Sequence, residues 1–210
     1  MTLNESQIQK IKSLLKLKLN NKLSKYDRKL IRFTSDIQFL IINRKKLKSS
    51  TKIEVNIFPN AVMRSILGHL LAAKTETDNV VPDNKIRSFI LNDSLPVHED
   101  IHVLYWFYPY SNIRISRDFT MSSKRGILGN FGFYSVIKFF PIAFLISDLP
   151  SYEGLPNFDE YRNLPIDHQS KIELSIFPIK EENWPESVTN DNHFVAGGRS
   201  FMDSLIAKPK

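Results

Sequence analysis

Residues 51–59 read Thr-Lys-Ile-Glu-Val-Asn-Ile-Phe-Pro, and this stretch decides the class of fold that we predict. Ile53, Val55 and Ile57 alternate with polar residues, so they would all lie on one face of an extended chain. A period of two is typical of a strand that buries one face and exposes the other. The stretch therefore predicts a strand that covers a core on one side.

The same pattern returns late in the chain. Residues 170–178 read Ser-Lys-Ile-Glu-Leu-Ser-Ile-Phe-Pro and match residues 51–59 at six of nine positions. The segments further upstream also agree, because Leu95-Pro96-Val97 resembles Leu164-Pro165-Ile166. Two weaker relatives end in an aromatic residue and Pro, residues 101–109 and 133–141. One interpretation is common strand-end chemistry, since Pro removes a ladder N–H; the other is an internal duplication whose equivalent strands pair.

Apolar residues at helical spacing predict helices on both sides of the first strand. Before it, we expect one helix over residues 3–23 and a second from Ser24 to about Lys48. Each begins with a capping-box pattern, Thr2-x-x-Glu5 and Ser24-x-x-Asp27. After the strand, Asn60 is expected to cap a helix that runs to about Lys74.

The rest of the chain is rich in aromatic and β-branched residues, which predicts strands. We expect them over residues 101–109, 113–119, 131–147 and 171–177. Residues 148–169 contain several Pro and Gly and indicate a long surface connection, and a short helix is expected near Ser200–Ala207. The predicted fold class is α+β: a basic helical arm over residues 1–50 and an α+β body over residues 51–210, with helices packed on a mainly antiparallel sheet in one compact domain.

Residues 126–147 are apolar enough to raise the alternative of a membrane span. Lys138 would then lie near the bilayer centre, at a cost of roughly 2.5–3.5 kcal/mol. Pro141 and two Gly also interrupt the segment. We therefore expect two buried strands bent at Pro141, and no integral membrane span.

The composition excludes several kinds of chemistry. The chain of 210 residues has no Cys, which removes disulfides, Cys-ligated zinc, iron–sulfur clusters and thiol nucleophiles. The first nine residues are polar and lack the apolar core of a secretory signal. Both features favour a reducing compartment, and we expect a cytoplasmic protein.

Positive charge is concentrated in the first quarter of the chain. Residues 1–52 carry 11 Lys and 3 Arg against 3 acidic residues, a net charge of +11, whereas the rest carries 15 basic and 19 acidic residues, a net charge of −4. Such asymmetry indicates a polyanionic partner. The predicted contacts are Lys10, Lys12, Lys16, Lys18, Lys22, Lys25, Arg28, Lys29, Arg32, Arg44, Lys45, Lys46 and Lys48.

We expect a non-enzymatic binding subunit whose preferred partner is nucleic acid. Two alternatives remain open. Apolar residues on the far side of the second predicted helix, Ile31, Phe39 and Ile42, favour a structural subunit of a larger protein assembly. The Lys-rich first helix also fits a peripheral protein on an anionic membrane.

A second basic cluster follows the aromatic run Tyr105, Trp106, Phe107, Tyr108 and Tyr110. It consists of Arg114, Arg117, Lys124 and Arg125. Basic groups beside exposed rings suit single-stranded nucleic acid, because the rings stack on bases. The alternative is a hairpin with a solvated face over an ordinary aromatic core.

No catalytic, metal or cofactor site is predicted. Residues 98–102 read His-Glu-Asp-Ile-His and fit the H-E-x-x-H zinc motif, which needs both His on one helical face. Here His102 begins a predicted strand. Arg117 and Asp118, with Glu153, Asp159 or Asp167 as metal partners, could also form a nuclease site, but no spacing resembles a two-metal centre. The chain contains no G-x-S-x-G and no phosphate-binding glycine loop.

Overall fold

A computed structural model describes residues 5–43, 52–73, 81–122, 131–176, 181–185, 194–196 and 205–207. Side chains are described over residues 22–42, 52–73, 83–116, 134–176 and 181–185. The helices are α1 (Glu5–Asn43), α2 (Pro59–Ala72), α3 (Val81–Leu91) and the short 3-10 helix η1 (Asp159–Tyr161). The strands are β1 (Lys52–Ile57), β2 (His102–Phe107), β3 (Ile113–Ser122), β4 (Phe131–Phe139), β5 (Ile142–Ser147), β6 (Ser170–Ser175), β7 (Phe194–Ala196) and β8 (Leu205–Ala207).

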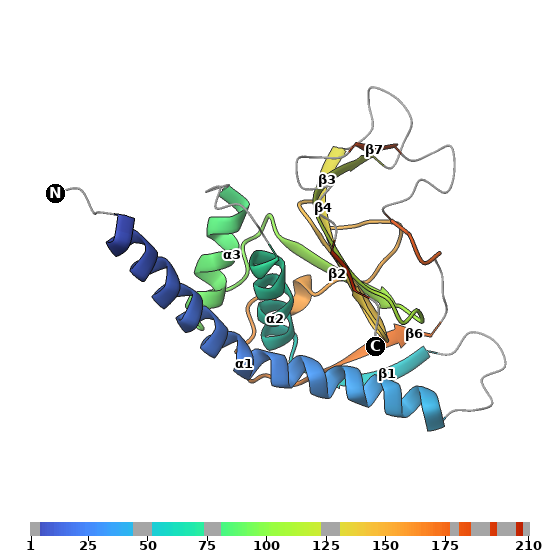
Figure 1. The fold of residues 1–210 in the computed structure, drawn as a ribbon. Coiled ribbons are helices and arrows are strands. Elements are labelled where there is room, and N and C mark those ends of the chain that lie inside the picture. Colours follow the sequence, from blue (N-terminus) through green and yellow to red (C-terminus); the bar gives the residue numbers. More distant parts are fainter. Residues whose placement is uncertain are drawn as a thin grey trace.

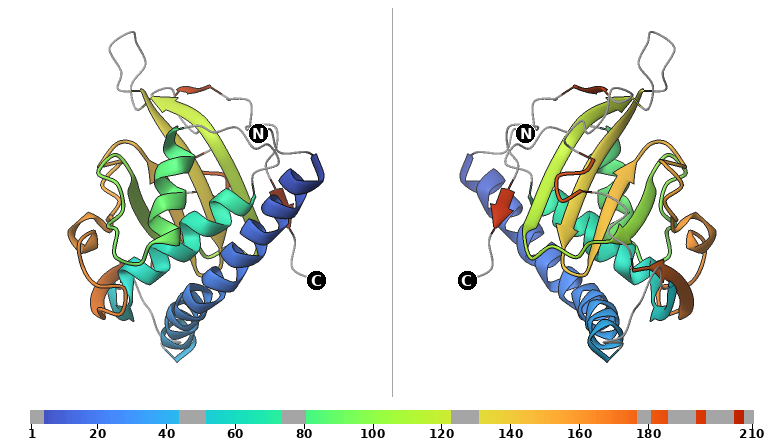
Figure 2. Two further views of the ribbon diagram at one scale, coloured as in Figure 1. Left: turned by 90° about the vertical axis from the view of Figure 1, so that its left-hand side faces the viewer. Right: turned by 90° about the vertical axis from the view of Figure 1, so that its right-hand side faces the viewer.

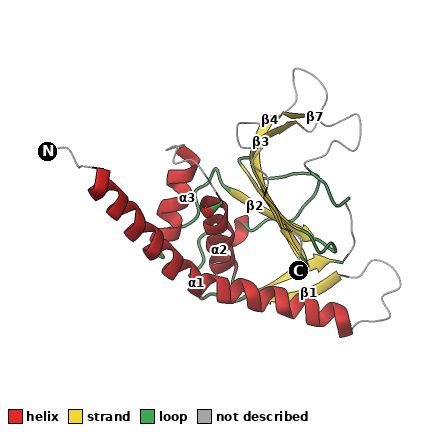
Figure 3. Ribbon diagram, in the orientation of Figure 1, coloured by secondary structure: helices red, strands yellow, loops and turns green. Residues whose placement is uncertain are grey.

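The fold is α+β, as predicted, and its strands form two antiparallel sheets. In the described part of the chain, one sheet consists of β1 and β6. The other has the order β2-β5-β4-β3-β7, and β8 also pairs with β3. Figure 1 shows α2 and α3 between α1 and the larger sheet, and Figure 3 separates the helices from the strands by colour. The turned views of Figure 2 show α1 running along the outside of the molecule.

The N-terminal region forms one continuous helix, α1. The prediction of two helices, with a new start at Ser24, is therefore wrong. Residues 3–43 contain neither Gly nor Pro, so no residue type in this stretch breaks a helix. Asp27 also does not act in a capping box. Its carboxylate accepts hydrogen bonds from Ser65 Oγ at 2.5 Å and lies 3.1 Å from His69 Nε2, both on α2.

The inner face of α1 belongs to the main core. Tyr26, Phe33 and Ile37 are at most 1% exposed and join the same cluster as the buried faces of β1, α2 and α3. Gly68 of α2 allows the close approach of α1, because a Cβ there would collide with Leu23. This part of the basic arm is therefore packed against the body.

Helix α2 begins at Pro59, one residue before the predicted cap. Pro suits the first helical position because its missing N–H has no partner to lose there. Asn60 consequently does not cap the helix; its side chain reaches the 162–164 segment. Nearly every residue of α2 is buried, since α1, α3 and the sheets surround it.

The two strands that share the KIExxIFP pattern are hydrogen-bonded to each other. Ile53 lies opposite Leu174, and Val55 lies opposite Ile172. All four side chains are buried in the main core. The two weaker relatives, in β2 and β4, do not pair, because β5 lies between them.

The larger sheet is covered on both faces, which explains its continuous apolar strands. Along β2, Val103, Tyr105 and Phe107 point into the helical core, while Leu104 and Trp106 belong to a second cluster. That second cluster is completed by Tyr152, Leu155 and Trp184 from the connections after β5 and β6.

Two further predictions are wrong, and one helix was not predicted. The 148–169 segment is not only a surface connection, because Tyr152, Leu155 and Phe158 are buried and its backbone pairs with the edge of β2. Residues 205–207 form β8 instead of a helix, since the edge of β3 offers unpaired backbone groups. Helix α3 lies in a stretch for which no element was predicted.

The apolar stretch around Lys138 consists of strands, as expected, with β4 and β5 on either side of Pro141. Lys138 is fully buried, and its ammonium donates to the carbonyl oxygen of Glu182 at 2.9 Å. Among the described residues, no helix has both the length and the apolar character that crossing a membrane requires.

Candidate nucleic-acid interface and neighbouring clusters

One exposed stripe follows the solvent side of α1. Its members are three or four residues apart, so they lie on one helical face. We call this face the outer stripe: Arg28, Ile31, Arg32, Ser35, Phe39 and Ile42. At 1.5 Å per residue it extends over about 21 Å. Ile31, Phe39 and Ile42 are 62%, 68% and 63% exposed, and these are large apolar side chains on a helix whose other face is buried.

Arg28 and Arg32 are the basic members of the outer stripe. They lie one helical turn apart and are both exposed. Within the described residues neither forms a hydrogen bond or an ion pair. Their guanidinium groups are therefore available for an external anion.

Three other predicted contact residues are engaged within the molecule. Lys22 and Lys25 lie 2.9 Å and 2.7 Å from the two carboxylate oxygens of Asp93. The ammonium of Lys29 lies 3.6 Å from the centroid of the Phe58 ring, a cation–π distance. These lysines hold α1 against the loop after α3 and against the start of α2.

Asp93 is the centre of this attachment. Partial burial acts to raise its pKa, but hydrogen bonds from Lys25, Tyr26 and Lys22 outweigh that effect and hold the pKa well below its usual range. Tyr26 donates to the same carboxylate at 2.6 Å. Burial raises the pKa of Tyr26, and the neighbouring anion adds to the increase. Asp93 is thus ionised and its charge is compensated.

The remaining predicted contacts lie partly outside the described residues. Lys10, Lys12, Lys16 and Lys18 belong to the helical backbone of α1, but their side chains are not among those described. Outside the described residues lie Arg44, Lys45, Lys46, Lys48, Lys124 and Arg125.

Four of the five rings beside the second basic cluster are buried, and the fifth, Tyr110, is half-buried. Tyr105, Trp106, Phe107 and Tyr108 are buried on the two faces of the sheet, so their rings cannot stack on bases. Arg114 is half-buried and its guanidinium lies 3.3 Å from Asn183 Oδ1. Arg117 lies on β3, and its side chain is not among those described.

The H-E-x-x-H string is not helical. His98 lies in the loop before β2, and His102 is the first residue of that strand. The Nδ1 atom of His102 lies 2.7 Å from Asp159 Oδ2, and Asp159 also pairs with Arg162 at 3.0 Å. The described residues contain no cluster of three His or carboxylate side chains that could hold a metal ion.

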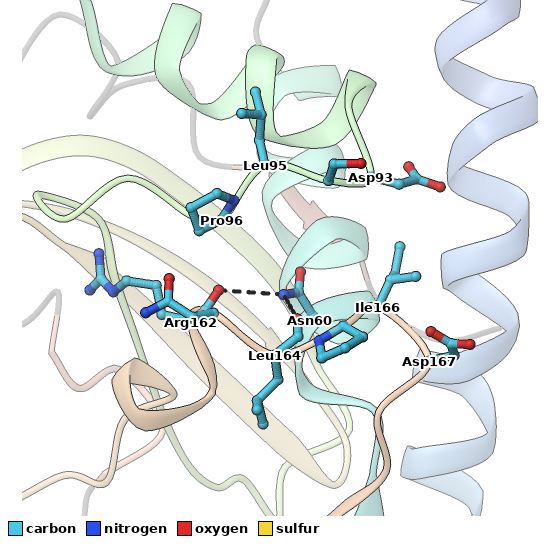
Figure 4. A pocket seen from close by; sticks show the side chains of 11 residues that line it. Asn60, Asp93, Leu95, Pro96, Arg162, Leu164, Ile166 and Asp167 are labelled. Carbon is cyan, nitrogen blue, oxygen red and sulfur yellow. Dashed lines mark hydrogen bonds between the residues drawn. The ribbon is translucent and has the colours of Figure 1, made fainter.

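A pocket of about 450 Å³ lies between two loops and was not predicted. One wall is the 93–96 segment after α3, and the other is the 162–167 segment before β6. Asn60 of α2 lies between them (Figure 4). The two walls include the similar segments Leu95-Pro96 and Leu164-Pro165, so their resemblance was a sequence signal for this site.

Some side chains of the lining point into the pocket, and others point away from it. Figure 4 shows Ile166 pointing into the space beside Asn60, whereas Leu95 and Leu164 point away from each other. The guanidinium of Arg162 is turned away from the interior. It donates to the carbonyl oxygen of His98 and lies close to those of Val97 and Ile101.

Comparisons with protein-family models, with curated proteins and with solved structures found no match for this chain. The functional conclusions therefore depend on the chemistry of the α1 surface and of the pocket.

Proposed function

We propose that the protein binds a polyanion through the outer stripe of α1, with nucleic acid as its preferred partner. The observation that supports the proposal most is the pair Arg28 and Arg32, exposed and one turn apart on a continuous helix that also carries most of the other basic residues of the arm. Arginine donates well to phosphate oxygens and its charge is independent of pH in the physiological range. Such contacts would be independent of nucleotide sequence.

Phe39 adds an aromatic group to the same face. Its side chain is 68% exposed and lies two turns beyond Arg32. An exposed ring beside guanidinium groups favours single-stranded nucleic acid, because every base has a face on which a ring can stack. We therefore expect tighter binding to single strands than to a duplex of equal length.

Point variants test the proposal better than truncation. Removing residues 1–48 would also remove Tyr26, Phe33 and Ile37 from the core. The informative variant is Arg28→Gln with Arg32→Gln, and its matched control is Lys52→Gln with Lys171→Gln. Those lysines are 64% and 68% exposed on the small sheet, so the control removes the same charge from another surface.

Fluorescence anisotropy with labelled single-stranded and duplex DNA and RNA is the measurement. The arginine variant should bind on the order of tenfold more weakly at 50 mM salt, while the lysine control should stay close to the wild type. Equal loss in both variants would mean that only net charge matters. Unchanged binding by the arginine variant would exclude the outer stripe as the interface.

A second candidate function is that of a structural subunit, and a specific observation favours it. Ile31, Phe39 and Ile42 are large apolar side chains exposed on the outer stripe, and contact with water is unfavourable for them. A protein partner for this face would combine apolar residues with carboxylates opposite Arg28 and Arg32. A photo-crosslinking residue in place of Phe39 separates the two functions in cells, because nuclease treatment returns a nucleic-acid adduct to almost the mobility of the free protein and leaves a protein adduct unchanged.

A further inference from the structure

The pocket between the two Leu-Pro walls contains an unused hydrogen-bond acceptor. Asn60 is only 4% exposed, and its Nδ2 group donates to the carbonyl oxygen of Leu164 at 2.8 Å. The orientation of the amide follows from this contact, because a carbonyl oxygen can only accept and the donor nitrogen must face it. The Oδ1 atom is left without a hydrogen-bond partner within the described structure. Figure 4 shows that oxygen turned from Leu164 towards the opposite wall.

The unused acceptor defines what the pocket can bind. A buried polar atom without a partner costs about 1–3 kcal/mol, and a ligand that donates a hydrogen bond to it would recover this energy. Two backbone carbonyl oxygens nearby, those of Asp93 and Leu95, already accept hydrogen bonds from the Arg64 guanidinium. Asn60 Oδ1 is a buried side-chain acceptor of the lining that lacks a donor within the described residues, and a complementary ligand carries an N–H or O–H group.

The charges of the lining point to a cation. Three charged residues line the pocket: Asp93, Arg162 and Asp167. Asp93 is compensated by Lys22 and Lys25, and Arg162 is compensated by Asp159 and turned away. Asp167 is exposed at the rim and forms no ion pair within the described residues. Asp167 is therefore the one charged side chain of the lining without an ion-pair partner in the described part of the chain, and its charge favours a cationic ligand.

The rest of the lining combines the polar residues Ser94 and Asn163 with apolar residues. Pro96, Pro165 and Ile166 surround the polar atoms, and the volume of about 450 Å³ is that of a small-molecule site. We propose that this pocket binds a primary ammonium group on a short apolar stem, with the ammonium donating to Asn60 Oδ1 and attracted to the pocket by the Asp167 carboxylate at the rim. A free alkylamine and the side chain of a Lys on another protein both present this chemistry.

The test is an NMR titration of the full chain at constant ionic strength with n-butylammonium chloride. Sodium butyrate and n-butanol are the matched anionic and neutral probes. We expect saturable shifts of the backbone amides of residues 93–95 and 163–167 and of the Asn60 side-chain amide, at a lower concentration of the ammonium probe than of either other probe. Equal saturation by butyrate or butanol, an unmoved Asn60 side-chain amide, or no saturation by butylammonium would overturn the proposal.

One variant addresses the rim charge without disturbing the fold. Asp167→Asn should weaken binding of butylammonium roughly two- to fivefold, as expected for an exposed charge pair. Glu99→Gln is its control, because Glu99 is exposed, carries the same charge and lies outside the pocket lining. An affinity that Asp167→Asn leaves unchanged, or that both variants reduce equally, would contradict the assigned role of Asp167.

A second probe identifies the source of the ammonium group. Acetyl-lysine methylamide saturating at a lower concentration than butylammonium would support a Lys side chain as the natural ligand, and the reverse order would support a free amine. This experiment uses no nucleic acid and no α1 variant, so its result is independent of the polyanion proposal.

Discussion

The Arg64 guanidinium is fully buried beneath the loop that follows α3. It donates to the carbonyl oxygens of Asn92 at 3.0 Å, Asp93 at 3.2 Å and Leu95 at 2.7 Å. The guanidinium also lies 3.9 Å from the centroid of the Phe89 ring. One side chain of α2 therefore fixes the end of α3 and one wall of the pocket.

Replacing this residue tests its structural role. Arg64→Met keeps most of the volume but removes the guanidinium donor from three loop carbonyl oxygens, of which that of Asn92 still accepts from the Leu95 N–H, and we expect a loss of roughly 2–4 kcal/mol in the free energy of unfolding. Chemical denaturation is the measurement. Arg87→Met, an exposed change on α3, should stay within about 0.5 kcal/mol of the wild type, and a similar loss in both variants would refute the special role of Arg64.

Asp93 gives stability a defined dependence on pH. Because its pKa is lower in the folded state than in the unfolded chain, its contribution is fully present above the unfolded pKa near 3.9 and is lost as the pH falls below that value. Asp93→Asn should therefore be less stable than the wild type at pH 7, by about 1 kcal/mol for a partly exposed cluster, and the difference should shrink below about pH 4. Urea denaturation at several pH values checks this; a difference that does not change with pH would contradict it.

At the scale of the element, α1 has two faces with opposite roles. Phe33 is 1% exposed in the main core, and Phe39 is 68% exposed on the outer stripe. Phe33→Ala should lower the free energy of unfolding by about 3–5 kcal/mol, because it leaves a cavity. Phe39→Ala on the same helix should change it by less than about 0.5 kcal/mol. Thermal and urea denaturation compare the two, and comparable losses would mean that the outer face is also packed.

The whole molecule shows where sequence patterns suffice and where they do not. Ile53, Val55 and Ile57 alternate so strictly that their strand and its buried face could be predicted, and the same is true of the apolar spacing in α2. Ser24 and Asp27 wrongly indicated a new helix, because a capping pattern cannot reveal that Asp27 finds its partners on α2. Long-range contacts of this kind depend on the tertiary fold.

The candidate sites also depend on long-range contacts that local sequence patterns do not reveal. The sequence shows that Arg28 and Arg32 are basic, but it does not show that they are free of ion pairs within the described part of the chain. Lys22 and Lys25 do form such pairs, with Asp93, which lies 68 to 71 residues later in the chain. The pocket joins Asn60 to the 162–167 segment, which lies more than 100 residues later in the chain, so local spacing could not predict it. Its one sequence signal was the repeated Leu-Pro pair.

The salt dependence of nucleic-acid binding tests the central claim most directly. Each phosphate contact contributes about 0.7 to the slope of log affinity against log salt for a single strand. The wild type should show a steep slope, and the variant with Arg28→Gln and Arg32→Gln should show one that is smaller by roughly 1.4, with the Lys52→Gln and Lys171→Gln control unchanged. The same slope in all three proteins, or an affinity that does not depend on salt, would contradict the assignment of the outer stripe as the polyanion-binding face.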